Sequence, residues 1–308
     1  MDNINIPKEE FLKLSTNEIA QITSELGKPK VGVFVPDGNR RMTLAFSGLH
    51  PDTDEFYHEN ARQTTTYFMD NLKVFFSHGL KTLFVPLISH NILERNQKYH
   101  EITLYEGLKK ILIDEDWLNF HKENDIRVST YGDINQLSKS AGTFNSEWIE
   151  KARNATAHHN THKIFYGFLS PKRVGMELAP LGIEFYNKNE REPSYEEQIL
   201  MYYGEPIDPA DFFIMSTKFA GLGALPPLIC GQETQMYFFV APGVMALTQE
   251  TYREILYDLL FCRPNSANNE YTNLDTKDIE SLKNYYLNHQ SAVIGIGRRI
   301  GKFWTPEI

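Results

Sequence analysis

A short polar segment that begins at Asp37 combines residue types that could bind and activate a phosphate ester. The segment reads Asp37-Gly38-Asn39-Arg40-Arg41 and follows a short apolar run. Gly38 would let the backbone approach a ligand closely, and Asn39 can donate hydrogen bonds from its amide. Arg40 and Arg41 can each hold phosphate oxygens in a bidentate manner. The segment therefore indicates a binding site for a diphosphate.

Asp37 is the residue of this segment that does not fit simple anion binding, because its carboxylate repels a diphosphate. A divalent cation between the two groups would offset the repulsion, so Asp37 is a candidate Mg²⁺ ligand. Alternatively, the arginines tune Asp37 as a catalytic acid or base. A competing interpretation is an ordinary turn with solvated arginines, since Pro, Asp, Gly and Asn dominate turns. The place of the segment in the fold must decide between these interpretations.

Six short apolar runs alternate with segments of helical periodicity along the chain. Continuous apolar runs are typical of strands buried on both faces of a parallel sheet. The alternation predicts a doubly wound α/β fold whose ligand crevice lies at the carboxyl ends of the strands, where helix N-termini also attract anions. The predicted strands are Val31–Val35, Thr82–Ile88, Ile126–Tyr131, Lys163–Leu169, Asp211–Met215 and Met236–Val240; the predicted helices are Glu59–His78, Tyr99–Glu123, Asn145–His158, Ser194–Tyr203, Gln249–Phe261 and Lys277–His289.

The remaining segments are expected to flank one core, because 308 residues fit one large α/β domain over residues 1–308. Residues 1–28 are expected to form an N-terminal helical arm, and residues from about 264 to 308 a C-terminal extension. Turn-rich stretches predict loops over residues 46–54, 186–194 and 264–275. The glycine-rich stretch 295–301 is expected to be a tail strand and not a dinucleotide-binding loop.

Composition and charge exclude several classes of function. The formal net charge of −9 argues against a nucleic-acid-binding protein, which needs a basic surface. No apolar run approaches the ~20 residues needed to span a bilayer, and the first residues lack the features of a secretory signal. We therefore expect a cytoplasmic protein with no membrane span. Cys230 and Cys262 have apolar neighbours and are expected to be buried free thiols.

Four segments in order resemble motifs of the cis-prenyltransferase family. The Asp37 segment resembles the family's opening Asp-Gly-Asn-Gly-Arg-Trp motif, and the later matches are Ser89–Arg95, Tyr131–Leu137 and Asp208–Ile214. The resemblance implies the fold of undecaprenyl diphosphate synthases, with a central, mostly parallel sheet flanked by helices. It also implies a prenyl diphosphate substrate, Mg²⁺ as a cofactor and a homodimer.

Two departures separate this chain from the chain-elongating members of that family. An arginine-containing motif that binds a second diphosphate is replaced by Met215–Gly221, which has no arginine, and a Glu-Asn-Trp motif is replaced by Asn91–Leu93. Losing charge-assisted contacts of ~1.5–3 kcal/mol each would weaken capture of a second diphosphate by orders of magnitude. This combination is similar to the terpene-synthase branch of the same fold.

Similarity to that branch extends over nearly the whole chain and implies a reaction. The enzyme would ionise an allylic, diterpenyl diphosphate, and water would capture the carbocation or a proton would be lost. The alternatives are transfer of the prenyl group to a small-molecule acceptor and chain elongation with a second diphosphate.

Four further residues are candidates for the pocket lining or for a catalytic base. Phe56 and Tyr57, expected in the loop after the diphosphate-binding segment, could offer an aromatic face to a carbocation, and Tyr57 a hydroxyl as base. His90 and Asn91 begin the segment His90–Glu94, which stands where the branch has an Asp-Asp-x-x-Asp motif. The sequence leaves open whether His90–Glu94 replaces that motif in function.

Overall fold

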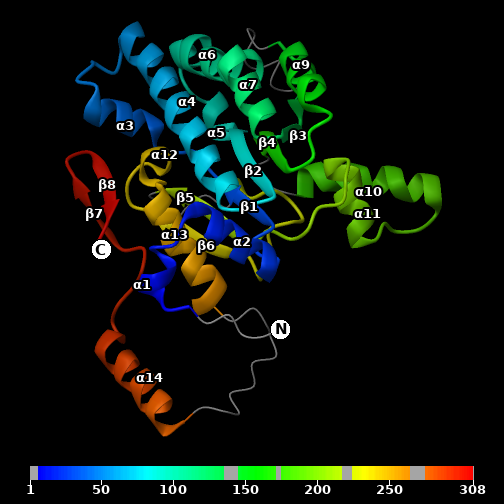
Figure 1. The fold of residues 1–308 in the computed structure, drawn as a ribbon. Coiled ribbons are helices and arrows are strands. Elements are labelled where there is room, and N and C mark those ends of the chain that lie inside the picture. The colour runs from blue at the N-terminus through cyan, green and yellow to red at the C-terminus, as the bar shows by residue number, and fades with distance from the viewer. Residues whose placement is uncertain (1–5, 135–144, 171–174, 217–223, 264–274, 308) are drawn as a thin grey trace.

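Six parallel strands form the central sheet of the computed structural model, which describes residues 6–134, 145–170, 175–216, 224–263 and 275–307 (Figure 1). Their order is β3-β4-β2-β1-β5-β6, and all five neighbouring pairs are parallel. Each predicted strand is confirmed to within one residue at either end. The strands are β1 Val31–Phe34, β2 Thr82–Ser89, β3 Ile126–Gly132, β4 His162–Ser170, β5 Phe212–Ser216 and β6 Gln235–Phe239.

Helices cover both faces of this sheet, as the alternation of side chains along β1 requires. Val33 faces a core that includes Tyr203 of α11, whereas Phe34 faces the larger core that includes Phe75 of α4. The helices are α1 Lys8–Phe11, α2 Thr16–Leu26, α3 Asn39–Phe46, α4 Asp54–Ser77, α5 His90–Leu93, α6 Tyr105–Ile113, α7 Glu115–Glu123, α9 Glu147–Thr156, α10 Gly175–Asn189, α11 Tyr195–Tyr203, α12 Gly243–Ala246, α13 Gln249–Tyr257 and α14 Thr276–His289, with π-helical turns η1 Tyr99–Leu104 and η3 Asp258–Cys262.

The chain leaves β1 for β2 on one side of the sheet and later returns to place β5 on the other side. The order of the strands therefore reverses between β1 and β5. In open α/β sheets, ligands bind outside the carboxyl ends of the strands at such a point. The residues that follow Phe34 and the last residues of β5 are thus placed where a ligand is expected.

Helix α4 begins earlier than its apolar periodicity predicts. The side chain of Thr53 accepts a hydrogen bond from the backbone N–H of Phe56, and Asp54 and Glu55 occupy the first turn. Capping and acidic residues at this end stabilise the extra turn. The expectation that Phe56 and Tyr57 lie in a loop is therefore wrong, because both are buried residues of α4.

Helix α10 is the main element that the sequence did not predict. It covers the first residues of the expected loop 186–194, contains Pro180 and Gly182 in its interior, and buries none of its residues. Proline and glycine lower helix propensity, so local sequence patterns do not predict this helix. The predicted helix Tyr99–Glu123 is divided into η1, α6 and α7, and the side chain of Asp114 caps α7.

The two ends of the chain differ in how they meet the core. The predicted N-terminal helix consists of α1 and α2, and Phe11 and Ile19 are fully buried in the main core. The C-terminal part contains α14, which buries no residue, and a hairpin of β7 Gly297–Ile300 and β8 Phe303–Pro306. The expected tail strand is thus one arm of a hairpin, whereas nearly all of the expected loop 264–275 lies outside the described residues.

The two cysteines differ in exposure from what their apolar neighbours predict. Both cysteines are free, but Cys262 is exposed, so the expectation that it is buried is wrong. Cys230 is partly exposed in the structure, and burial raises the pKa of its thiol to about 12. Within the described ranges, no helix is both long enough and apolar enough to cross a bilayer.

Candidate active site

The segment after β1 is a tight turn whose shape depends on Gly38. The backbone N–H of Asp37 donates to the carbonyl of Val35 at 2.8 Å, and Gly38, with φ of 82°, is the N-cap of α3. A side chain at Gly38 would be strained at this φ, and its Cβ would lie 3.0 Å from Cα of Pro242. The amide of Asn39 donates to the carbonyl of Pro36 at 2.8 Å, so in this structure it stabilises the turn.

Asp37 is held by the end of the neighbouring strand β5. The backbone N–H of Ser216 donates to Oδ1 of Asp37 at 2.9 Å, and the Ser216 hydroxyl donates to the same oxygen. Burial raises the pKa of Asp37, whereas the hydrogen bonds from Ser216 and the charge of Arg41 partly offset this rise. Both hydrogen bonds from Ser216 to this carboxylate thus end on Oδ1.

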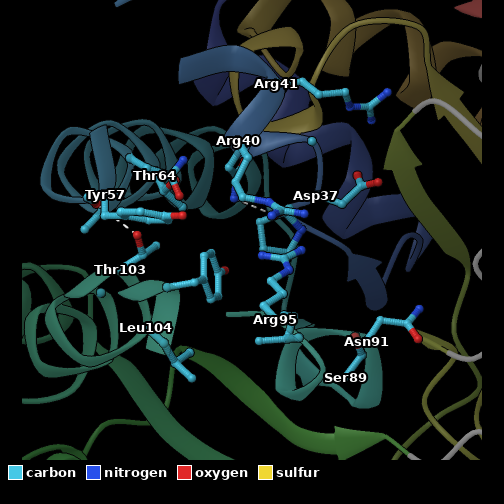
Figure 2. Close-up of a pocket in the computed structure, with 18 of the residues that line it drawn as sticks. Asp37, Arg40, Arg41, Tyr57, Thr64, Ser89, Asn91, Arg95, Thr103 and Leu104 are labelled. Atoms are coloured by element: carbon cyan, nitrogen blue, oxygen red, sulfur yellow. Dashed lines mark hydrogen bonds between the residues drawn. The ribbon is translucent and has the colours of Figure 1, made fainter. Parts of the chain in front are cut away.

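The side chains of the two neighbouring arginines, Arg40 and Arg41, point in different directions. Figure 2 shows that Arg41 extends away from Arg40, and its positive charge acts on Asp37. Arg40 extends toward Arg95, which follows α5 on the opposite wall. Burial, and then the positive charge of Arg95, lower the pKa of Arg40. Across the described chain, neither Arg40 nor Arg95 forms an ion pair with an acidic residue, so both charges are available to an anion.

Arg95 was missed as a site residue by sequence reasoning, although it ends the motif-like segment Ser89–Arg95. Its part in the site depends on a short bend after α5 that brings the side chain across the mouth of a pocket. Ser216 was missed for the same kind of reason, because only the pairing of β5 with β1 places it beside Asp37. Both residues lay within segments that the motif comparison had singled out.

A cavity of about 970 Å³ opens beside these residues. Its mouth includes Asp37, Arg40, Arg95 and the exposed side chain of Asn91, and three residues of the C-terminal hairpin also line it. Apolar residues line much of its interior, together with the polar side chains of Asn60, Thr64 and Thr65, and such a lining suits a hydrocarbon chain. Interior residues include Leu44, Phe56, Ala61, Leu87, Ile88, Leu104, Gly107, Leu108 and Ile111.

The other predicted pocket residues have distinct environments. Tyr57 lines the cavity, accepts a hydrogen bond at its hydroxyl from the Asn96 amide at 2.8 Å, and accepts another at its carbonyl from Thr103. Asn91 lies in α5 and lines the mouth. His90 begins α5, but its side chain lies outside the described residues.

A metal could be held here only with help from a ligand. No group of three or more His, Cys, Asp or Glu side chains suited to a metal occurs among the described residues. Mg²⁺, however, is commonly bound by one or two carboxylates together with substrate phosphates and water. Asp37, with one oxygen fixed by Ser216, fits that kind of site.

Comparison with solved structures identifies the architecture. The lavandulyl diphosphate synthase of Lavandula x intermedia, solved with dimethylallyl diphosphate, matches with a TM-score of 0.58 at 13% identity, covering 77% of this chain and 97% of that one. A probable undecaprenyl diphosphate synthase of Campylobacter jejuni matches with a TM-score of 0.55 at 15% identity, with the same coverage. This chain has the cis-prenyltransferase fold. The predicted fold class is confirmed.

Two curated relatives match along almost the whole chain, whereas no family model matches it. The tuberculosinyl adenosine transferase of Mycobacterium tuberculosis is 29% identical over 304 residues, covering 98% of this chain and 99% of the relative. The (+)-kolavelool synthase of Herpetosiphon aurantiacus is 24% identical over 305 residues, covering 97% and 94%. The predicted resemblance to the terpene-synthase branch is confirmed, and the chain is an enzyme of the terpene synthase and prenyltransferase class.

Proposed function

We propose that this enzyme is a terpene synthase that ionises an allylic, diterpenyl diphosphate. Diphosphate leaves, and water captures the carbocation to give an alcohol or a proton is lost to give a hydrocarbon. One observation carries the proposal. Arg40 and Arg95, uncompensated by any acid of the described chain, meet at the mouth of a large cavity beside the partly buried carboxylate of Asp37.

The residues of the mouth would act on the charge that develops as the bond to diphosphate breaks. Arg40 and Arg95 would hold the phosphate oxygens, with Arg41, Gly38 and Asn39 completing the binding site. Cations that are already in position stabilise the departing anion more than they stabilise the bound substrate, which lowers the barrier to ionisation. The apolar interior would surround the prenyl chain, and the aromatic faces of Phe56 and Tyr57 would favour a nearby carbocation.

Mg²⁺ is part of this proposal because Asp37 has the position of a ligand shared with the substrate. When bound, the ion would neutralise part of the charge on the leaving diphosphate. The contribution of the protein is to hold the carboxylate of Asp37 at the mouth through the hydrogen bonds from Ser216 to Oδ1. Asp37 is thereby proposed as the catalytic residue of the site.

A second candidate function is transfer of the prenyl group to a small-molecule acceptor. The relative that is 29% identical is named a tuberculosinyl adenosine transferase, which favours a nucleoside as such an acceptor. Transfer and hydrolysis share the ionisation step and differ only in the nucleophile. The same residues would therefore serve both reactions.

Product analysis tests these proposals together. The purified protein would be incubated with geranylgeranyl diphosphate and with halimadienyl-type and kolavenyl-type diphosphates, with Mg²⁺ and with or without adenosine. Mass spectrometry is expected to detect a diterpene alcohol or hydrocarbon. An adenosine adduct would favour transfer, and a longer product formed with isopentenyl diphosphate would favour chain elongation. Absence of diphosphate release from every substrate would contradict the proposal.

We further propose that the enzyme is a homodimer. Helices α10 and α14 bury no residue, yet they expose the large apolar side chains of Ile183, Tyr186, Ile279 and Tyr286. Such surfaces are typical of positions that another subunit covers. Size-exclusion chromatography with light scattering is expected to give twice the mass of 35.6 kDa, and a monomer at micromolar concentration would contradict the proposal.

A further inference from the structure

Tyr99 lies under the two arginines that meet at the mouth of the cavity. The Cζ atom of Arg95 is 4.3 Å from the centroid of the Tyr99 ring, and the Cζ atom of Arg40 is 5.7 Å from it. Both distances are within the ~6 Å range of cation–π attraction. We propose that Tyr99 is a positioning residue, which holds Arg40 and Arg95 together for a diphosphate and leaves the charge of both arginines uncompensated. This inference rests on the proposed function.

The need for such a residue follows from the like charges of the arginines. Two guanidinium groups that meet at the mouth of a pocket repel each other, and the positive charge of Arg95 adds to burial in lowering the pKa of Arg40. A carboxylate could hold them together, but it would also neutralise them and repel the ligand. The ring of Tyr99 attracts both cations through its quadrupole and carries no net charge. The full double positive charge therefore remains for the diphosphate.

The ring of Tyr99 is itself fixed in place. Only 8% of Tyr99 is exposed, and its backbone N–H donates to Oδ1 of Asn96 at 2.9 Å. The amide of Asn96 donates in turn to the hydroxyl of Tyr57 at 2.8 Å, which links the ring to α4. Tyr99 is also the first residue of η1, and π-helical turns are rare and frequently occur at functional sites. Burial of the ring and this chain of hydrogen bonds therefore position Tyr99 through contacts within the protein.

Substitution of the ring separates this role from that of the hydroxyl. Tyr99→Leu keeps an apolar side chain but removes the ring, and Tyr99→Phe keeps the ring and removes the hydroxyl. Cation–π contacts of ordinary strength correspond to about 2- to 30-fold in affinity each. We expect Tyr99→Leu to weaken binding of inorganic diphosphate about tenfold by calorimetry, and Tyr99→Phe to bind within about twofold of the parent.

Tyr105→Leu is the matched control. Tyr105 lies in the adjoining helix α6, where the ammonium group of Lys109 is 6.0 Å from its ring centroid, but Tyr105 is not part of the cavity wall. Removing this ring should leave diphosphate affinity unchanged. Thermal denaturation of each variant verifies folding, and Tyr99→Met replaces Tyr99→Leu if the latter does not fold.

The outcomes separate this inference from the proposed function, because binding is measured without turnover. Unchanged affinity in Tyr99→Leu would overturn the inference and leave the proposed function standing. Equal losses of affinity or turnover in Tyr99→Phe and Tyr99→Leu would also overturn it, because the hydroxyl would then be the working group. If the parent protein binds inorganic diphosphate but does not turn over any prenyl diphosphate, only the proposed function is contradicted. A parent protein that binds no diphosphate would contradict both.

Discussion

The two walls of the cavity mouth hold their charged groups in different ways. On one wall, Asp37 follows β1 and is tied by two hydrogen bonds to Ser216 at the end of β5. On the other wall, Arg95 follows the short helix α5 and rests on an aromatic ring. The hydrogen bonds fix the direction of one carboxylate oxygen, whereas the cation–π contact places a guanidinium over the face of a ring without using its N–H donors. The difference suggests that Asp37 needs one fixed orientation, while Arg95 needs its N–H donors for an anion.

The largest expected effect comes from substitution of Asp37, whose carboxylate is held by hydrogen bonds. Asp37→Asn keeps the shape of the side chain and removes its charge. We expect kcat to fall by about 10²-fold or more, as for loss of an electrostatic or acid–base group, while the prenyl diphosphate still binds. Asp52→Asn is the control, because Asp52 also lies at the mouth but is exposed. Near-full activity of Asp37→Asn would show that this turn is not the catalytic centre.

The next effect concerns the arginines on either side of the mouth. Arg40→Ala or Arg95→Ala removes a charge-assisted contact of ~1.5–3 kcal/mol, or roughly ten- to a hundredfold in affinity for the prenyl diphosphate. Measuring kcat and KM separately matters, since an arginine that acts only on the departing diphosphate would lower kcat instead. If removal of Arg95 changed neither constant, the opposite wall would have no part in binding.

A smaller effect is expected when one of the hydrogen bonds to Asp37 is removed. Ser216→Ala removes one donor to Oδ1, and hydrogen bonds favour the ionised form, so the pKa of Asp37 should rise further. If activity requires ionised Asp37, kcat rises with pH through that pKa, and the acidic limb of the profile shifts to higher pH. We expect kcat to fall by about tenfold at most near the limb. Ser216→Thr should restore the parent profile.

The smallest effect concerns Gly107, a glycine inside helix α6 that lines the cavity. A Cβ built there meets no atom within 4 Å, so Gly107→Ala is sterically tolerated. Alanine in a helix interior is favoured over glycine by ~0.5–1 kcal/mol, so the free energy of unfolding by urea should rise by about that amount. Gly107→Leu would instead fill part of the cavity. Unchanged KM of Gly107→Leu for a diterpenyl substrate would mean that the prenyl chain lies elsewhere.

The sequence predicted the sheet and the diphosphate-binding turn because their signals are local. Buried strands such as Val31–Phe34 are continuous apolar runs, and the turn is a contiguous motif. Arg95, Tyr99 and Ser216 were not predicted as site residues, since their roles depend on which strands pair and where a bend directs a side chain. Helix α10 was missed because Pro180 and Gly182 oppose the local signal for a helix.

The exposure of helix α14 implies that its helix content depends on protein concentration. It has 14 residues, none of them buried, and an isolated helix of that length is only marginally stable in water. Its helix–coil equilibrium must then depend on whatever covers its apolar side chains. If a second subunit does so, the helix content of the protein follows mass action, and far-ultraviolet circular dichroism should report more helix per residue at high protein concentration than at low.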